Sequence, residues 1–174
     1  MKLYTCQAAD GHCFLAVSFS DSFYDLAQFG VTIPDMQTLI DQFSTIRPLL
    51  VPHDGLKPLD TNTLRICAPI PYPRQDIICL GINYTAHAEE ADRFDSDAFG
   101  GELRQNSNTA YLINSIASII SDLSQGMTLR AGTIIATGTP AGVGMGMEPP
   151  QFLNTGDTVV CEIEGIGTLT NVVQ

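Results

Sequence analysis

His87 and Glu90 have the side-chain types and the spacing of a proton-transferring pair. Asn83 is a favourable N-cap and predicts a short helix from Tyr84 to about residue 91. Residues three apart share one face of a helix, so the carboxylate can orient the imidazole and stabilise its charged form. The imidazole can then act as a general base near neutral pH. On spacing alone, a helix-surface ion pair is the favoured interpretation.

Thr139 is the second candidate, in the run TGTP at 137–140. Hydroxyl and backbone N–H groups of such a loop can hold a carbonyl or carboxylate oxygen of a substrate. A purely structural turn explains the same residues equally well. The glycine-rich loop that continues to Gly146 is not a P-loop, because no Lys-Ser or Lys-Thr pair follows it. Met147 stands where a dinucleotide fingerprint needs glycine, and two prolines follow instead of a helix.

Glu162 and Glu164 lie two apart on a predicted strand, so their carboxylates point to one side. Two carboxylates on one face can bind a hard cation such as Mg²⁺. Acidic side chains are seldom buried, and we interpret this pair as the solvated outer face of the strand.

The surrounding stretch, residues 128–173, predicts a tightly turned β unit. The apolar run 134–136 predicts a buried strand, and the alternation over 159–164 is typical of a half-buried strand. A glycine turn precedes each strand, at Gly132 and Gly156. The glycine-rich loop between the strands lets a ligand approach the backbone closely.

Residues 1–70 predict a small α+β domain, separated by the prolines at 69, 71 and 73 from a second domain over 71–174. Strands are predicted at Lys2–Cys6 and Cys13–Ser18. A helix follows, with an apolar stripe formed by Met36, Leu39, Ile40, Phe43 and Ile46, an N-cap at Thr32 and an end at Pro48.

The second domain begins with a buried strand predicted over 76–80. Residues 92–101 are polar and acidic, which is typical of a loop. The run 106–108 can cap a helix over Thr109–Ser124 with a broad apolar face, and Gly126 ends it.

Several of these segments resemble the fumarylacetoacetate hydrolase family: GINYTAH at 81–87, TGTPAGVG from 137, and the ending from GD at 156 to EIEGIG, together with Gln105 and Thr109. The resemblance implies an α+β fold, a mixed β-sheet roll of the fumarylacetoacetate hydrolase type beside a small N-terminal α+β domain. Family members carry a long central segment between the His motif and the Gly-Glu-x-x-Gln motif. Here only residues 91–101 join them, so we expect an internally shortened roll.

The resemblance also implies a site and a reaction. His87 and Glu90 match a pair that activates water. The positions that match substrate-binding residues are Asn83, Tyr84, Gln105, Thr109, Thr139 and Pro140. The implied reaction is metal-dependent hydrolysis of a C–C bond, or isomerisation, in a 2-oxo acid or β-diketone such as an acylpyruvate. Mg²⁺ or Mn²⁺ would stabilise the enolate. No metal ligand is assigned, because the family's Glu-x-Glu pair, ligand Asp and active-site Lys fall in the missing segment.

Two classes of function stay open. The chain is an enzyme if a partner chain or its own carboxylates recruit a metal, the candidates being Asp92, Asp95, Asp97, Glu162 and Glu164. Otherwise it is a non-catalytic, shortened family member that acts as a binding or assembly partner, or an internally shortened gene product with no role. Removing strands from a roll uncovers apolar faces and sheet edges, so we expect either a homodimer or a chain of only marginal stability.

The charge of the chain narrows its partners. Eight basic residues oppose nineteen acidic ones, a formal net charge of −11. Nucleic acid and anionic membranes would be repelled. No apolar run approaches the length of a membrane span, and the first residues do not resemble a signal peptide, so we expect a cytoplasmic protein.

The five cysteines are Cys6, Cys13, Cys67, Cys79 and Cys161. Their number is odd, no Cys-x-x-Cys pair occurs, and all lie in apolar runs. The sequence therefore predicts reduced, buried thiols in place of disulfides or a zinc site.

Overall fold

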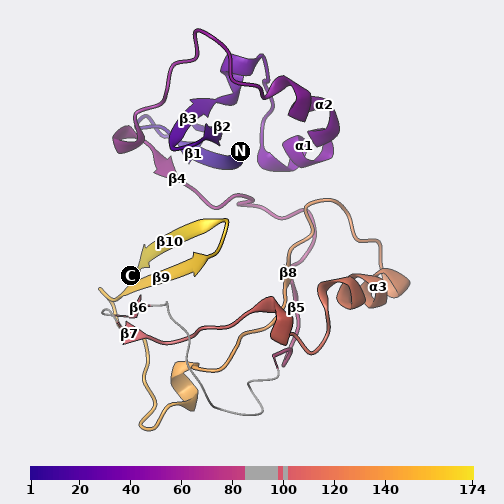
Figure 1. The fold of residues 1–174 in the computed structure, drawn as a ribbon, viewed down its shortest axis with the longest axis vertical. Helices are drawn as coiled ribbons and strands as arrows, with labels where there is room; N and C mark the ends of the chain where they lie inside the picture. Colours follow the sequence, from indigo (N-terminus) through magenta and orange to yellow (C-terminus); the bar gives the residue numbers. More distant parts are fainter. Residues whose placement is uncertain (85–97, 100–101) are drawn as a thin grey trace. The chain divides into compact units, whose positions relative to one another are not determined.

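The structure, a computed structural model, describes residues 1–84, 98–99 and 102–174 and divides into two compact units (Figure 1). The N-terminal unit comprises Met1–Ile77 and Leu129–Ile134, and the C-terminal unit comprises Ile78–Thr128 and Ile135–Gln174. Both units combine strands and helices, so the predicted α+β fold is confirmed.

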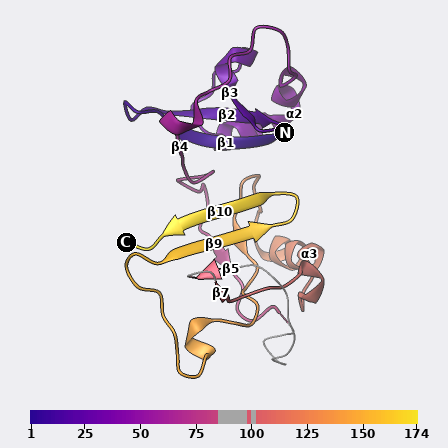
Figure 2. The same cartoon turned by 60° about the vertical axis from the view of Figure 1, so that its left-hand side comes forward.

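A four-stranded antiparallel sheet with the order β3-β2-β1-β4 forms the N-terminal unit (Figure 2). Its strands are β1 (Lys2–Gln7), β2 (Cys13–Phe19), β3 (Ser22–Asp25) and β4 (Arg65–Ile66). The first two strands confirm those predicted at Lys2–Cys6 and Cys13–Ser18, and β3 was not predicted. The core cluster contains Leu15, Val17, Leu26, Phe29, Val31, Met36, Leu39, Ile46 and Leu50.

The predicted helix of this unit exists, but in two pieces, α1 (Met36–Asp41) and α2 (Phe43–Ile46). Thr32 is not its N-cap. The carboxylate of Asp35 accepts a hydrogen bond from the backbone N–H of Thr38 at 2.7 Å and caps α1 instead. An aspartate directly before the first turn also interacts favourably with the helix dipole, which explains why the helix begins there.

Among its described residues, the C-terminal unit contains short strand pairs and one α-helix. β5 (Ile78–Cys79) runs parallel to β8 (Ile135–Ala136), β6 (Ala98–Phe99) pairs with β7 (Glu102–Leu103), and β9 (Thr158–Ile163) forms an antiparallel hairpin with β10 (Gly167–Val172). The helix is α3 (Ile116–Gly126). Within the described residues, no helix has the length and apolar character required to cross a membrane.

The helix expected over 109–124 begins later than predicted. Asn108 caps only a 3-10 turn, Thr109–Tyr111, and α3 starts after a new N-cap, Ser115. The intervening residues are held by tertiary contact, because Leu112 forms a β-bridge with Tyr84. The expected broad apolar face is only partly covered: Ile119 is buried, but Ile116 is exposed.

The half-buried pattern predicted for β9 is also not realised. Val159 and Val160 are half-buried, whereas Cys161 is exposed and Ile163 is 59% exposed. Within the part of the chain that the structure describes, the hairpin forms a sheet of two strands. Such a sheet has few neighbours to cover its apolar face.

All five cysteines are free, as predicted. The expectation that they are buried is wrong for Cys13, Cys79 and Cys161, which are exposed. Cys13 and Cys79 stand in strands, and Cys161 stands in the uncovered hairpin. Of the five, Cys6 is buried.

Candidate functional site

Parallel pairing of β5 with β8 brings two candidate segments together. Ile78 pairs with Ile135, so the segment 81–84 and the loop 137–141 leave the same edge of the pair. A Cβ built at Gly138 would lie 3.0 Å from the carbonyl oxygen of Gly81 and 3.3 Å from Cβ of Asn83. Gly138 has φ of +99°, so glycine is required there for its backbone conformation as well as for space.

Asn83 is 1% exposed, and its amide is bound to the segment that precedes α3. Its Oδ1 accepts a hydrogen bond from the N–H of Asn114 at 2.8 Å, and its Nδ2 donates to the carbonyl of Asn114 at 3.3 Å. Tyr84 forms its bridge with Leu112, so residue 84 pairs like a strand and does not begin a helix. His87 and Glu90 lie outside the described residues, and their pairing stays a prediction.

Gln105 holds the loop that carries Thr139. Its Nε2 donates to Oγ1 of Thr139 at 2.9 Å and to the carbonyl oxygens of Pro140 at 2.9 Å and Ala141 at 3.3 Å. We call this set of contacts the amide clasp. Because the Thr139 hydroxyl accepts from Gln105, its own proton can be donated elsewhere, and Thr139 is exposed.

The structure therefore brings Gln105, Thr139 and Pro140 together. Thr109 lies on the exposed surface of its 3-10 turn. Asn83 lies next to Gly138 and supports the loop there. Because Asn83 is buried, its amide is not exposed to solvent.

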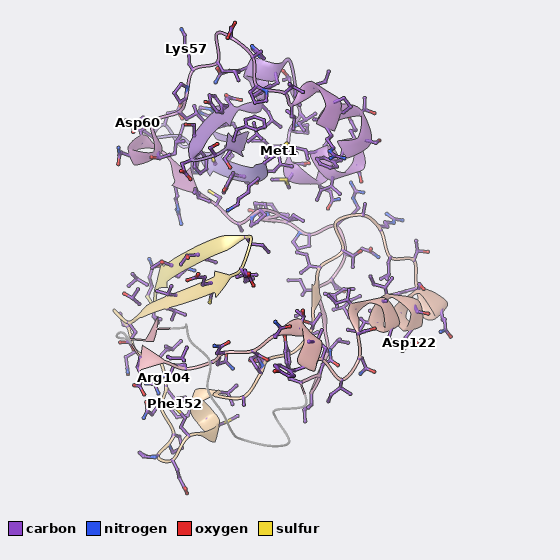
Figure 3. All side chains as sticks on the ribbon, in the orientation of Figure 1. Met1, Lys57, Asp60, Arg104, Asp122 and Phe152 are labelled. Atoms are coloured by element: carbon purple, nitrogen blue, oxygen red, sulfur yellow. The ribbon has the colours of Figure 1, made fainter. Side chains whose placement is uncertain are left out.

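A cavity of about 300 Å³ lies next to the amide clasp, since Gln105 belongs to both. Its lining residues are Arg104, Gln105, Gly142, Val143, Gly144, Met147, Gln151, Phe152, Leu153, Val159, Val160 and Cys161. Figure 3 shows Arg104 and Phe152 on the same side of the C-terminal unit. Most of the wall is apolar, which is typical of small-molecule pockets.

Two glycines bring the walls of this cavity into backbone contact. A Cβ at Gly142, which has φ of +97°, would overlap the carbonyl oxygen of Arg104, and a Cβ at Gly144 would overlap that of Gln151. The glycines of the TGTPAGVG run thus let the loop pack directly on its neighbours.

Sequence reasoning missed Arg104. Its side chain is 18% exposed, with Nη2 3.3 Å from Oε2 of Glu102 and Nη1 3.0 Å from Sδ of Met147. The sequence did not single it out, because the predicted second domain over 71–174 contains three other arginines.

The described residues do not fit a divalent metal. They contain no group of three or more His, Cys, Asp or Glu side chains that could hold an ion. Glu162 and Glu164 are exposed, as the sequence predicted. The carboxylates at 92, 95 and 97 lie outside the described residues.

Comparison with known proteins locates the sequence match in the C-terminal part. Residues 96–174 match the family described as Fumarylacetoacetate (FAA) hydrolase C-terminal. Oxaloacetate tautomerase YisK of Bacillus subtilis is 56% identical over 71 residues, which are 41% of this chain and 24% of that protein. The uncharacterized protein SH1982 of Staphylococcus haemolyticus is 51% identical over 72 residues. The match thus spans about a quarter of the length of these relatives.

Solved structures match the fold over the whole chain. A fumarylacetoacetate hydrolase from Exiguobacterium antarcticum has a TM-score of 0.81 at 23% identity and covers 100% of this chain and 99% of its own. Maleylpyruvate hydrolase from Sphingobium sp. SYK-6, in complex with manganese(II) and pyruvate, has a TM-score of 0.74 at 21% identity, with 98% of each chain covered. The resemblance stated from the sequence is thus confirmed by the family match over residues 96–174, and the fold matches over the whole chain.

Proposed function

We propose that the chain binds a 2-oxo acid or β-diketone such as an acylpyruvate. The chain has the fumarylacetoacetate hydrolase fold and matches that family's C-terminal domain over residues 96–174. The proposed reaction is hydrolysis of a C–C bond in that substrate, or its isomerisation. The observation that carries this proposal is the amide clasp, which presents the Thr139 hydroxyl next to a cavity of small-molecule size.

The proposed roles follow from the contacts. Thr139 donates its hydroxyl proton to a carbonyl or carboxylate oxygen of the substrate, and Gln105 fixes the direction of that donation. Pro140 keeps the loop in place, and Asn83 supports it through Gly138. Tyr84 and Thr109 are proposed substrate contacts on the resemblance alone.

His87 and Glu90 are proposed to activate water, also on the resemblance. A neutral imidazole oriented by a carboxylate removes a proton from water near neutral pH. Mg²⁺ or Mn²⁺ would supply Lewis acidity when bound. Since the described residues offer no ligand set, we assign no step to the metal.

A second function is favoured by the same lack of ligands among the described residues. A chain with a substrate-type loop, whose described residues offer no metal ligand set, can act as a binding or assembly partner of a full-length relative. Its exposed apolar side chains, such as Ile163 and Leu169, would then be covered by that relative.

Turnover and metal binding separate the two functions. We would follow acylpyruvate cleavage and oxaloacetate tautomerisation with Mn²⁺ or Mg²⁺, and metal binding by calorimetry. An enzyme should lose roughly a hundredfold in kcat in Thr139→Val, because one donor to the developing oxyanion is removed. Thr139→Ser keeps the hydroxyl and should stay within about tenfold of the original rate. No turnover and no metal binding would reject the enzymatic proposal, and co-purification with a full-length relative would then support assembly.

A further inference from the structure

We propose that Gln37 and Gln75 are positioning residues of the candidate site, because they hold a turn at 130–133 and so set the register of the β5–β8 pair. This inference rests on the proposed function only for the task of the loop that follows β8. The register itself can be measured without turnover.

The turn at 130–133 belongs to the N-terminal unit, whereas α3 before it and β8 after it belong to the C-terminal unit. Gln37, a buried residue of α1, binds this turn: its Nε2 donates to the carbonyl oxygen of Ala131 at 2.8 Å. Gly132 has φ of +86°, and a Cβ there would overlap the Gln37 amide. Glycine is therefore required at this position for the backbone conformation and for the space that the amide occupies.

Gln75 binds both ends of the same turn through one oxygen. Its Oε1 accepts from the backbone N–H of Arg130 at 3.2 Å and from the Thr133 hydroxyl at 2.7 Å. The hydroxyl also lies 2.7 Å from the carbonyl oxygen of Arg130, and its single proton serves one acceptor at a time. That carbonyl already accepts from the N–H of Thr133 at 3.0 Å, so donation to Gln75 leaves each of these groups with a partner. We call the contacts of Gln37 and Gln75 with the turn the turn clamp.

The strands that follow the turn clamp contain little that fixes their own register. β5 and β8 pair over two residues each, beginning with Ile78 and Ile135. Each of these is preceded by another isoleucine, Ile77 and Ile134. A slip of one residue would again place isoleucine beside isoleucine, so the apolar pattern alone does not exclude it.

The turn clamp excludes this slip because its residues lie directly before both strands. Gln75 precedes Ile78 by three residues, and Thr133 precedes Ile135 by two. A slip of one residue moves a strand by about 3.3 Å, which would break the hydrogen bond of 2.7 Å between Gln75 and Thr133. Because Thr139 follows β8 closely in the chain, the register also determines where its hydroxyl lies.

Hydrogen exchange of the Leu80 amide reports on the strand pairing, since its N–H donates to the carbonyl oxygen of Ala136 at 2.9 Å. Thr133→Val removes the hydroxyl donor and should accelerate exchange at Leu80 about tenfold, as expected for one lost hydrogen bond. Thr133→Ser keeps the hydroxyl and should stay within about twofold of the original rate. Thr170→Val makes the same change at an exposed position of β10 and should leave exchange at Leu80 unchanged.

The amide of Val173 separates a local effect from a general loss of stability. Its N–H donates to the carbonyl oxygen of Asp157 at 2.8 Å, and its exchange should be unchanged in Thr133→Val. Gln37→Met removes the other contact of the turn clamp while keeping a side chain of similar length. It should also accelerate exchange at Leu80, and it provides the same comparison if Thr133→Val does not fold.

Cross-linking tests the register directly, because Cys79 pairs with Ala136 in the observed register. Paired residues of neighbouring strands lie about 4.8 Å apart, within the range of a disulfide. Ala136→Cys should therefore form a disulfide with Cys79 when oxidised glutathione takes up the two electrons. Thr137→Cys, one residue out of register, should form it about tenfold more slowly. Adding Thr133→Val should reduce this difference about threefold or more, because the register is then less strongly held.

Three results would overturn the inference: unchanged exchange at Leu80 in both variants of the turn clamp, equal acceleration at Leu80 and Val173, or the same acceleration in Thr133→Ser as in Thr133→Val. Failure of the proposed function is distinguishable from these. Faster exchange at Leu80 without acylpyruvate turnover in the original protein would sustain the inference and reject the enzyme. Turnover together with unchanged exchange would sustain the enzyme and reject the inference.

Discussion

Gln105 shows how one side chain can fix a loop. A single amide nitrogen donates to three oxygen atoms of residues 139–141. The importance of Gln105 was predicted from the resemblance, but its contact was not. Gln105 and Thr139 are 34 residues apart in the sequence. Periodicity and turn chemistry predict only local structure, so they do not predict a contact between such distant residues. Charge alone did not identify Arg104 either, because the predicted second domain contains three other arginines.

Replacing Gln105 by glutamate tests the clasp. A carboxylate cannot donate to the carbonyls of Pro140 and Ala141, so Gln105→Glu should lower the free energy of unfolding by about 1–3 kcal/mol. Gln125→Glu makes the same change at an exposed position of α3. Its free energy of unfolding should stay within about 0.5 kcal/mol of that of the original protein. Urea denaturation measures both, and hydrogen exchange of residues 137–144 should accelerate in the first variant alone. Identical denaturation and hydrogen-exchange profiles for the two variants would show that the amide clasp does not stabilise the loop.

Cys6 makes a second prediction at this scale. Burial, with a further contribution from Cys67, raises the pKa of the Cys6 thiol to about 11 from its ordinary value of 9.0. Because only the thiolate reacts, its reactive fraction near pH 8 falls roughly a hundredfold. Iodoacetamide should therefore modify Cys13 and Cys161 first, and Cys6 only after unfolding. Equal rates for Cys6 and Cys13 in the folded protein would contradict the assigned burial.

Elements were predictable where the pattern is local. The strand-like runs of β1 and β2 are visible in the sequence, as is the apolar stripe of α1 and α2. The ends of the helices and strands depend on tertiary contacts, which a local pattern of apolar residues does not predict. The late start of α3 follows from the Tyr84–Leu112 bridge, and the exposed face of β9 follows from a sheet with too few strands.

The N-cap of α1 gives a prediction with a pH dependence. The N–H of Thr38 lowers the pKa of Asp35 below its ordinary value of 3.8, and Arg74 contributes in the same direction. A lowered folded-state pKa means that the stabilisation is present above 3.8 and is lost as pH falls through the folded value. Asp35→Ala should cost about 1 kcal/mol at pH 7, and this difference should narrow below pH 3.8.

Asp35→Asn is the control for this prediction, because asparagine caps a helix without titrating in this range. It should retain most of the stability and lose the pH dependence. Urea denaturation at a series of pH values measures all three proteins. If the difference in free energy of unfolding between the original protein and Asp35→Ala stayed constant through the acid range, the charge of the carboxylate would not contribute to this cap.

At the scale of the molecule, the apolar surface that remains uncovered matters most. The sequence predicted that a shortened roll would expose apolar faces, and the hairpin exposes Ile163 at 59% and Leu169 at 60%. Leu169 pairs with Cys161, and Ile163 pairs with Gly167, so these side chains share one face of the hairpin. A sheet of two strands is marginally stable alone and offers unpaired edges, which favours association.

We therefore expect the chain to self-associate through this face as its concentration rises. Leu169→Lys places a charge on the apolar face and should weaken association about tenfold or more, because a lysine is costly to bury without a partner. Thr170→Lys adds the same charge to the next residue of β10, which points to the other face, and should change association little. Sedimentation velocity over a range of concentrations measures both. A compact monomer with a sharp melting transition at every concentration would contradict the expected association. Equal effects of the two lysines would show that charge, rather than the face bearing Leu169, controls it.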